Sequence, residues 1–146
     1  MEYDDNYFMG EALKLAARAA EEGEIPVGAV VACQNTIIAR AYNQTQKLND
    51  VTAHAEMLAI TAATQYLGAK YLTNCTLYIT LEPCIMCAGA IFWSQVSRVV
   101  YGAEDKKRGY STLQRPVLHP KTTLLTGVRG EECQAILLNF FKNMRT

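Results

Sequence analysis

Apolar residues recur at helical spacing in three stretches of the chain. Residues 5–22 carry them three or four positions apart, and Gly23 follows as a helix stop. Residues 54–67 are rich in Ala and Leu and end before Gly68, with Met57, Leu58, Ile60 and Thr61 available for one face. Residues 131–143 repeat the pattern, with an apolar side made of Cys133, Ile136, Leu137, Phe140 and Phe141. We predict a helix in each stretch.

Shorter runs of β-branched and apolar residues predict strands between these helices. Residues 27–32 and 36–41 are two such runs joined by Cys33, Gln34 and Asn35, which is typical of a hairpin with a polar turn. Further strands are expected at 76–80, 98–101 and 122–126, a short helix at 84–93 and an irregular segment at 104–121.

The order of these elements indicates the fold class. Strands that alternate with helical crossovers predict a three-layer α/β/α domain around a mixed sheet. The hairpin supplies the antiparallel part, and the strand–helix–strand unit at 76–101 supplies the parallel part. Because no repeat, low-complexity segment or linker interrupts the chain, we expect a single domain over residues 1–146.

Composition favours a domain with a buried core and no membrane segment. Half of the 146 residues are apolar and 19% are charged. The longest apolar runs, 26–33 and 88–93, are too short to cross a bilayer. Residues 1–6 are acidic, and the apolar segment of a secretory signal does not follow them. We therefore expect a cytoplasmic location.

Five cysteines without a secretory signal favour a reduced compartment, so no disulfide framework is expected. The close pair Cys84 and Cys87 indicates metal or redox chemistry. The isolated Cys33, Cys75 and Cys133 are expected to be small buried apolar side chains.

The net charge of zero hides an asymmetry along the chain. Residues 1–97 hold five basic and ten acidic side chains, whereas residues 98–146 hold nine basic and four acidic ones. A basic final third would suit a surface that binds a polyanion, because phosphate contacts supply most of the affinity for nucleic acid. An ordinary solvated surface can have the same composition, so charge alone leaves both readings open.

Two segments combine residues that suit a catalytic metal. Residues 52–56 read Thr-Ala-His-Ala-Glu and residues 81–87 read Leu-Glu-Pro-Cys-Ile-Met-Cys, each at the expected start of a helix. One helical turn points the sulfurs of Cys84 and Cys87 the same way, and a helix N-terminus favours thiolates. With His54 they make three ligands suited to zinc, and the fourth tetrahedral position stays open for water, as in catalytic sites.

Glu56 follows His54 by two residues and is the expected proton shuttle. It would take a proton from zinc-bound water, which ionises near neutral pH, and deliver it to the substrate. This suits the hydrolytic deamination of an aromatic amidine, in which hydroxide attacks the amino-bearing carbon, a ring nitrogen is protonated and ammonia leaves. A structural zinc site would need a fourth ligand, for which His119, Cys33, Cys75 and Cys133 remain open. A redox pair would leave His54 and Glu56 without a role.

The order His-x-Glu followed by Pro-Cys-x-x-Cys is the signature of the zinc deaminases. The chain resembles the cytidine-deaminase type of these enzymes and, within them, the bacterial tRNA-specific adenosine deaminases. The similar segments are residues 24–30, 52–56, 76–90 and 98–103, together with Glu132-Cys133 and Phe140-Phe141. The resemblance implies a five-stranded sheet between helices, one zinc ion per subunit and a homodimer. It also implies conversion of adenosine to inosine at the wobble position of a tRNA anticodon stem-loop.

The resemblance further implies a set of substrate contacts. Asn43 would hydrogen-bond the target base, which suits an amide that offers both donor and acceptor, although Asn43 could instead be a turn residue. Val27, Ala55 and Leu81 would line the base pocket. Asp105 would contact the sugar–phosphate backbone of the nucleotide, or else be a solvated loop acid. Residues 106–121 depart from the family pattern, and there Tyr110 is expected to be an exposed loop side chain or a platform for a base.

Two other functions compete with tRNA editing. The same metal and glutamate would serve a deaminase of a free base or nucleotide of the guanine or cytosine type. A zinc-stabilised binding module without catalysis would instead fill all four zinc positions with protein ligands and leave Glu56 without a role.

Overall fold

Five strands form one sheet in the order β2-β1-β3-β4-β5. The computed structural model describes residues 2–144, with β1 at Gly28–Cys33, β2 at Thr36–Tyr42, β3 at Cys75–Leu81, β4 at Arg98–Ala103 and β5 at Thr123–Thr126. β1 pairs antiparallel with both β2 and β3, whereas β3–β4 and β4–β5 are parallel. The predicted mixed five-stranded sheet is confirmed.

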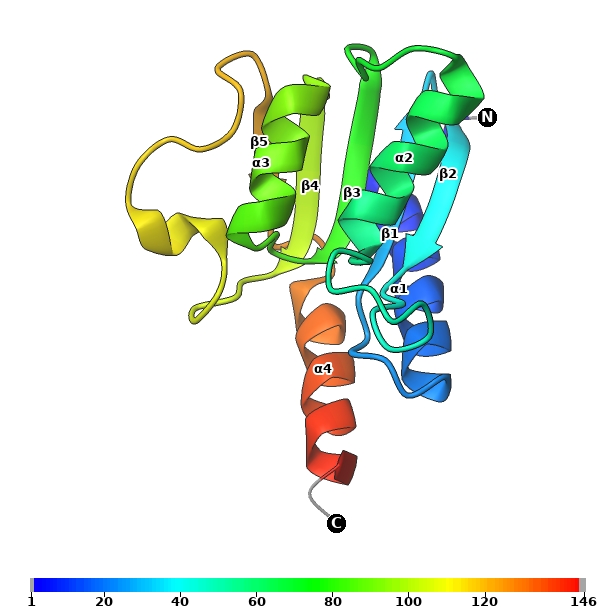
Figure 1. The fold of residues 1–146 in the computed structure, drawn as a ribbon, viewed down its shortest axis with the longest axis vertical. Helices are drawn as coiled ribbons and strands as arrows, with labels where there is room; N and C mark the ends of the chain where they lie inside the picture. Colours follow the sequence, from blue (N-terminus) through cyan, green and yellow to red (C-terminus); the bar gives the residue numbers. More distant parts are fainter. Residues whose placement is uncertain (1, 145–146) are drawn as a thin grey trace.

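Helices cover both faces of the sheet (Figure 1). On one face lie α2 (Ala55–Leu67) and α3 (Ile85–Ser94), packed on strand residues such as Val31, Leu77 and Val99. On the other lie α1 (Asp5–Glu21) and α4 (Gly130–Met144), packed on the alternate residues Val30, Tyr78 and Val100. The three-layer α/β/α prediction is therefore confirmed. Within residues 2–144 no helix has the length and apolar character needed to cross a membrane.

The hairpin turn is set by two residues with positive φ. Gln34 has φ 51° and Asn35 has φ 63°, the signature of a two-residue turn whose twist matches that of the flanking strands. The Asn35 side chain also accepts from the Tyr3 backbone N–H at 2.8 Å and donates to its carbonyl at 2.9 Å. Cys33, expected in the turn, is the last residue of β1.

The buried face of α2 differs from the prediction. The helix buries Ala55, Glu56, Ala59 and Ala63, while Met57, Leu58 and Ile60 are half-buried and Thr61 is exposed. Three alanines spaced by four form a smooth row that packs closely on the sheet. The larger side chains therefore lie to the sides of the contact.

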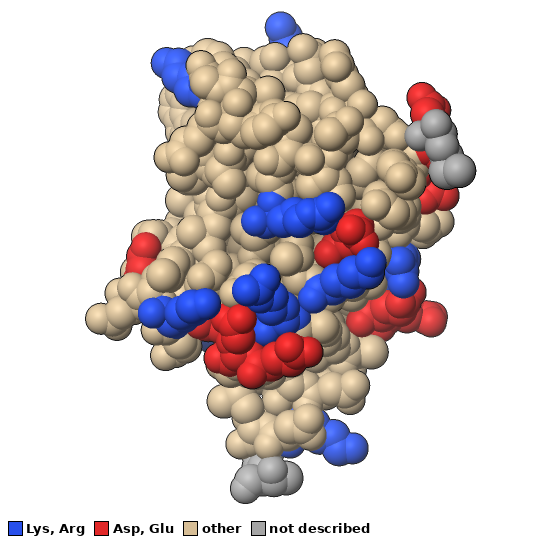
Figure 2. All heavy atoms as spheres, turned by 90° about the vertical axis from the view of Figure 1, so that its right-hand side faces the viewer, with Lys and Arg blue, Asp and Glu red and all other residues tan. Residues whose placement is uncertain are grey.

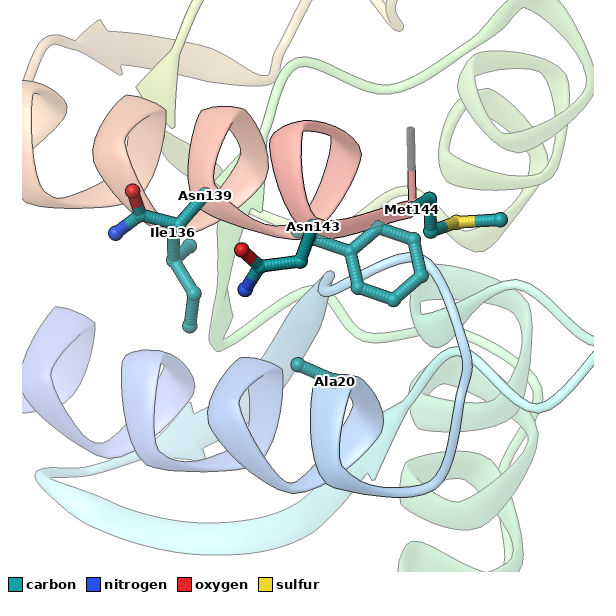
Figure 3. A pocket seen from close by; sticks show the side chains of 6 residues that line it. Ala20, Ile136, Asn139, Asn143 and Met144 are labelled. Carbon is teal, nitrogen blue, oxygen red and sulfur yellow. The ribbon is translucent and has the colours of Figure 1, made fainter. Parts of the chain in front are cut away.

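Most of the apolar side expected for α4 is not buried either. Of that set only Cys133 is fully covered; Ile136, Leu137 and Phe140 are half-buried and Phe141 is exposed. The reason is that α4 packs on the sheet only near its start and then extends beyond the sheet (Figure 1). Between its outer part and the end of α1 lies a pocket of about 320 Å³ (Figure 3), lined by Ala20, Ile136, Asn139, Phe140, Asn143 and Met144.

The expectation that Cys33 and Cys75 are isolated apolar side chains is wrong. Cys33 and Cys75 lie directly opposite one another on β1 and β3, with Cα atoms 4.4 Å apart, and form a disulfide. The cause is the register between two strands that lie 42 residues apart in the sequence. Cys133 is a buried free cysteine, as predicted.

Candidate active site

The three predicted metal ligands lie where two helices begin. Helices α2 and α3 start at the same end of the sheet (Figure 1), with His54 and Cys84 as the residues that precede them in extended backbone. Cys87 lies in the first turn of α3 and is fully buried. Because helix N-termini carry partial positive charge, this placement favours thiolates.

The geometry of the three residues fits a tetrahedral metal. His54 Nδ1 lies 3.6 Å from Cys84 Sγ and 3.4 Å from Cys87 Sγ. All three ligand atoms lie within 4.8 Å of one another. Zinc bonds of about 2.3 Å to sulfur and 2.0 Å to nitrogen, meeting at the tetrahedral angle, would separate the two atoms by about 3.5 Å. The donor set can therefore hold a zinc ion with little rearrangement.

Electrostatics at the ligands favour ionisation of one thiol first. A hydrogen bond from Cys87 and contact with His54 lower the pKa of the Cys84 thiol to about 3. The hydrogen bond with Cys84 raises the pKa of Cys87, and the same neighbour raises the pKa of His54. The pair therefore carries a thiolate at neutral pH, which is the form a metal binds.

Glu56 is buried beside these ligands. It lies in the first turn of α2 with 4% of its surface exposed, and its carboxyl group hydrogen-bonds the Cys87 thiol. Burial raises the pKa of Glu56 to about 7. A carboxyl group held at this place can reach a water or substrate proton at the metal position.

The other residues considered as a fourth ligand lie elsewhere. Among residues 2–144, His54, Cys84 and Cys87 form the one group of three or more potential ligands. His119 packs against the ring of Phe92 and accepts a hydrogen bond from the Lys121 backbone at 3.1 Å. Cys33 and Cys75 are bonded to each other, and Cys133 lies against Gly102. Three protein ligands leave one tetrahedral position open, which is the arrangement of catalytic zinc.

Comparison with protein families agrees with this chemistry. Residues 2–103 match the model of the cytidine and deoxycytidylate deaminase zinc-binding region. This chain belongs to that deaminase family. Its domain is thus a zinc-binding one, and His54, Cys84 and Cys87 form its possible zinc site.

Individual proteins similar to this deaminase include tRNA-specific adenosine deaminases and a guanine deaminase. A tRNA-specific adenosine deaminase of Aquifex aeolicus is 44% identical over 95% of each chain. A solved structure from a study of A-to-I editing by tRNA:A34 deaminases at the wobble position has a TM-score of 0.84 and 41% identity, over 90% of this chain and 99% of that one. A guanine deaminase of Bacillus subtilis has a TM-score of 0.70 and 37% identity, over 78% and 79%.

The predicted base-pocket residues of the deaminase lie around the start of α2. Val27 precedes β1 and is 8% exposed, Ala55 is fully buried, and Leu81 at the end of β3 is half-buried. All three belong to the cluster between the sheet and helices α2 and α3, or pack against it. Their side chains are apolar, as the wall of a pocket for an aromatic ring requires.

Asn43 follows β2 and is 7% exposed. Its Nδ2 donates to the Ile25 carbonyl at 3.2 Å, and its Oδ1 accepts from the Thr45 backbone at 3.3 Å. The next residue, Gln44, donates its backbone N–H to the carbonyl of Ala53, so this segment adjoins the chain that leads into His54. Within residues 2–144 the Asn43 side chain makes no other hydrogen bond, so one amide N–H and one oxygen lone pair remain for a ligand.

Two loops flank the candidate ligands, and a buried carboxylate that the sequence analysis missed holds each of them. The first, residues 44–52, is called the His-side loop: Glu24, 1% exposed, accepts from the backbone of Gln46 at 3.0 Å and of Lys47 at 2.8 Å. The second, residues 105–111, is called the Cys-side loop: Glu82, 2% exposed, accepts from its backbone at both ends. The available sequence signal was an acidic residue one or two positions before a proline: Glu24 before Pro26 and Glu82 before Pro83.

For two residues of the Cys-side loop, Tyr110 and Asp105, the structure differs from what the sequence predicted. Tyr110 is 8% exposed and belongs to the core, so it is neither an exposed side chain nor a platform for a base. Asp105 is not a freely solvated acid, because its Oδ1 accepts from the backbone of Lys107 at 3.2 Å and of Arg108 at 3.0 Å. The Asp105 carboxylate thus shapes the turn that carries the basic residues.

Proposed function

We propose that this deaminase converts adenosine to inosine at the wobble position of tRNA by hydrolysis. The observation that carries the proposal is the three-ligand group with an open position beside buried Glu56, in a chain 44% identical to a tRNA-specific adenosine deaminase. The zinc would be held by His54, Cys84 and Cys87. When bound, it would supply a Lewis acid that makes water nucleophilic at neutral pH.

Glu56 would move the protons in this reaction. Water adds to the amino-bearing carbon of adenine, and Glu56 accepts the proton that the water loses. It passes this proton to the ring nitrogen. The proton of the added hydroxyl group then moves to the amino group, so that a C=O bond forms while the C–N bond breaks and ammonia leaves. Burial of Glu56 excludes bulk water from this path.

The remaining substrate contacts are proposed from the same geometry. The free N–H and lone pair of Asn43 would read the edge of the base, while Val27, Ala55 and Leu81 would pack against its faces. Asp105 Oδ2 accepts no hydrogen bond from residues 2–144 and would accept one from a sugar hydroxyl of the nucleotide. The target base must be unpaired or flipped out to reach the metal, and a tRNA substrate agrees with the predicted cytoplasmic location.

A homodimer is proposed from the outward face of α3. Ile85 is 58% exposed and Trp93 is 73% exposed, and between them Gly89 faces open space. The three residues are spaced by four and form one stripe, which a second copy would cover. Sedimentation equilibrium tests this: we expect a dimer for the natural chain and a monomer for Trp93→Asp. A natural chain that sediments as a monomer would contradict the proposal.

The decisive assay supplies an anticodon stem-loop with adenosine at the wobble position to the zinc-loaded protein. We expect inosine, detected by nucleoside analysis. A matched stem-loop with adenosine only in the paired stem should remain unchanged. The absence of inosine from a protein with one zinc per chain would overturn the proposal.

The second candidate is a deaminase of a free base or nucleotide, and the 37% identity to a guanine deaminase favours it. The same zinc and Glu56 would serve this reaction. Ammonia release from guanine or cytosine, with no inosine formed in the stem-loop, would establish it in place of tRNA editing.

A further inference from the structure

Both ends of the Cys-side loop are attached to one carboxylate. Asp105 donates its backbone N–H to Glu82 Oε1 at 3.0 Å, and Ser111 donates its backbone N–H to Glu82 Oε2 at 3.0 Å. Each oxygen of Glu82 thus holds one end of a seven-residue segment. Since Glu82 is 2% exposed, water cannot readily replace either bond.

The loop lies directly against the chain that leads to the candidate ligand Cys84. Tyr110 donates its backbone N–H to the Pro83 carbonyl at 2.9 Å, and Gly109 forms an isolated β-bridge with Cys84. A Cβ atom at Gly109 would overlap the Glu82 carboxyl group. The backbone at Gly109 is therefore in close contact with the Glu82 carboxylate. The contacts with Pro83 and Cys84 place the loop at the rim of the metal site.

Three consecutive cations project from the loop between its attached ends. Lys106, Lys107 and Arg108 are exposed, and within residues 2–144 none of them forms an ion pair. The turn that carries them is fixed from inside by Asp105 Oδ1. Three unpaired cations in a fixed turn beside a metal site suit the phosphates that flank a target base.

We propose that Glu82 is a positioning residue for the RNA substrate: its carboxylate fixes the backbone of the Cys-side loop so that Lys106, Lys107 and Arg108 meet those phosphates. This inference rests on the proposed function. A carboxylate is required because it offers an acceptor to each of the two N–H groups, whereas the amide of Gln offers one acceptor and one donor. In Glu82→Gln one end of the loop would lose its bond.

Glu24 provides a matched control. It is 1% exposed and holds the backbone of the His-side loop with two bonds of the same kind. The cation of that loop, Lys47, forms an ion pair with Glu22 at 3.4 Å. Substitution of Glu24 therefore reproduces the loss of a buried carboxylate without changing the position of the three unpaired cations.

A double-mutant cycle on the zinc-loaded protein tests the inference. It combines Glu82→Gln with a triple variant in which Lys106, Lys107 and Arg108 are Gln, and measures kcat, KM for the stem-loop and zinc content. We expect Glu82→Gln to raise KM by about tenfold, with kcat changed less than about threefold and zinc retained. The combined variant should have a KM at least about fivefold below the product of the two separate effects, because both act through the same contact. Glu24→Gln combined with the triple variant should give the simple product.

Failure of the proposed function and failure of the proposed role of Glu82 give different results. If the natural chain forms no inosine, the proposed function fails. If the natural chain is active but the effects of Glu82→Gln and the triple variant multiply, or if Glu82→Gln lowers kcat or zinc content with KM unchanged, the inference fails. If Glu82→Gln does not fold, Gly109→Ala takes its place in the cycle, since the added Cβ displaces the loop from the carboxylate; simple multiplication there also overturns the inference.

Discussion

The two loops beside the candidate site share one anchoring device and differ in the charge they carry. Glu24 holds the His-side loop and Glu82 holds the Cys-side loop, each through two backbone N–H groups on a buried carboxylate. In the His-side loop the cation Lys47 is neutralised by Glu22, whereas the three cations of the Cys-side loop form no ion pair with any residue that the structure describes. A buried carboxylate thus orders the backbone of a loop regardless of the charges that the loop exposes. The exposed charges determine what the loop can bind.

The surface around the β2 edge extends the contrast. Figure 2 shows basic and acidic side chains side by side across the middle of that face. Glu11 pairs with both Lys14 and Arg40, and Glu22 pairs with both Arg18 and Lys47. Alternating charges of this kind attract a polyanion poorly. We therefore expect RNA to approach from the side of the Cys-side loop.

The largest effect is expected on kcat, from substitution of Glu56, which lies at the candidate site between the two loops. Glu56→Gln should lower kcat by roughly two to four orders of magnitude, the scale of general acid–base catalysis. Zinc content and stem-loop affinity should stay near normal, because neither the ligands nor the loops change. Single-turnover kinetics with metal analysis provide the measurement. Near-normal turnover would remove Glu56 from the mechanism.

The next effect concerns the cations of the Cys-side loop. In the Glu56→Gln background, changing Lys106, Lys107 and Arg108 to Gln should weaken stem-loop binding by about 10- to 100-fold at physiological salt. The plot of log affinity against log salt should become shallower by about 2, since three phosphate contacts would each release counterions. Fluorescence anisotropy over a salt series measures both quantities. An unchanged slope would show that the loop does not meet phosphates.

A smaller effect is expected at the opposite end of the sheet, away from both loops. Asp5 at the start of α1 accepts two hydrogen bonds from Arg98, at 2.8 and 2.6 Å, and one from the Tyr78 hydroxyl at 2.7 Å. Asp5→Asn should lower the free energy of unfolding by about 1–2 kcal/mol at pH 7. The KM for the stem-loop should not change, which separates loss of stability from loss of loop position.

The pH dependence of the Asp5 effect has a defined sign. The hydrogen bond from Arg98 lowers the pKa of Asp5 below its ordinary value of 3.8. Its stabilisation is therefore fully present well above pH 3.8 and is lost as the pH falls through the lower value of the folded state. Urea unfolding of the natural chain and of Asp5→Asn gives the free energy of unfolding at each pH. The two values should converge below pH 3.8. A difference that grows in acid would contradict this assignment.

The smallest effect is expected for the cation of the His-side loop. Lys47→Gln removes an exposed cation that Glu22 already neutralises, so KM for the stem-loop should change by less than about twofold. The same steady-state assay measures it, with a single Lys107→Gln variant as the comparison. An equal rise in KM for both variants would remove the distinction between the two loops.

Local patterns explain how much of the fold was predictable. The four α-helices and five strands within residues 2–144 were expected within one or two residues of their observed ends, because hydrophobic periodicity and stop residues such as Gly23 and Gly68 act over a few positions. The short 3-10 helix at Tyr110–Leu113 lies in the segment that was expected to be irregular. The buried face of α2 was missed, since periodicity gives more weight to Met57 and Leu58 than to a row of alanines. The face of α4 was missed because periodicity does not show where the sheet ends.

The sequence by itself determined the composition of the candidate metal group. His54 directly precedes one helix, and Cys84 and Cys87 span the first turn of another, so local geometry orients each ligand relative to its own helix. Glu56 follows from its spacing of two residues from His54. All four residues lie at the starts of two helices, and the sequence motif already predicts this placement.

Only the tertiary structure decided which distant segments lie together. The disulfide of Cys33 and Cys75 depends on the register of β1 against β3, and the roles of Glu24 and Glu82 depend on loops more than twenty residues away in the sequence. No local spacing encodes these contacts. The two cysteines lie on strands far apart in the sequence, and the partners of Glu24 and Glu82 are backbone N–H groups, which every non-proline residue carries. The ligands could therefore be predicted from their order along the chain, whereas the loops that flank them could not.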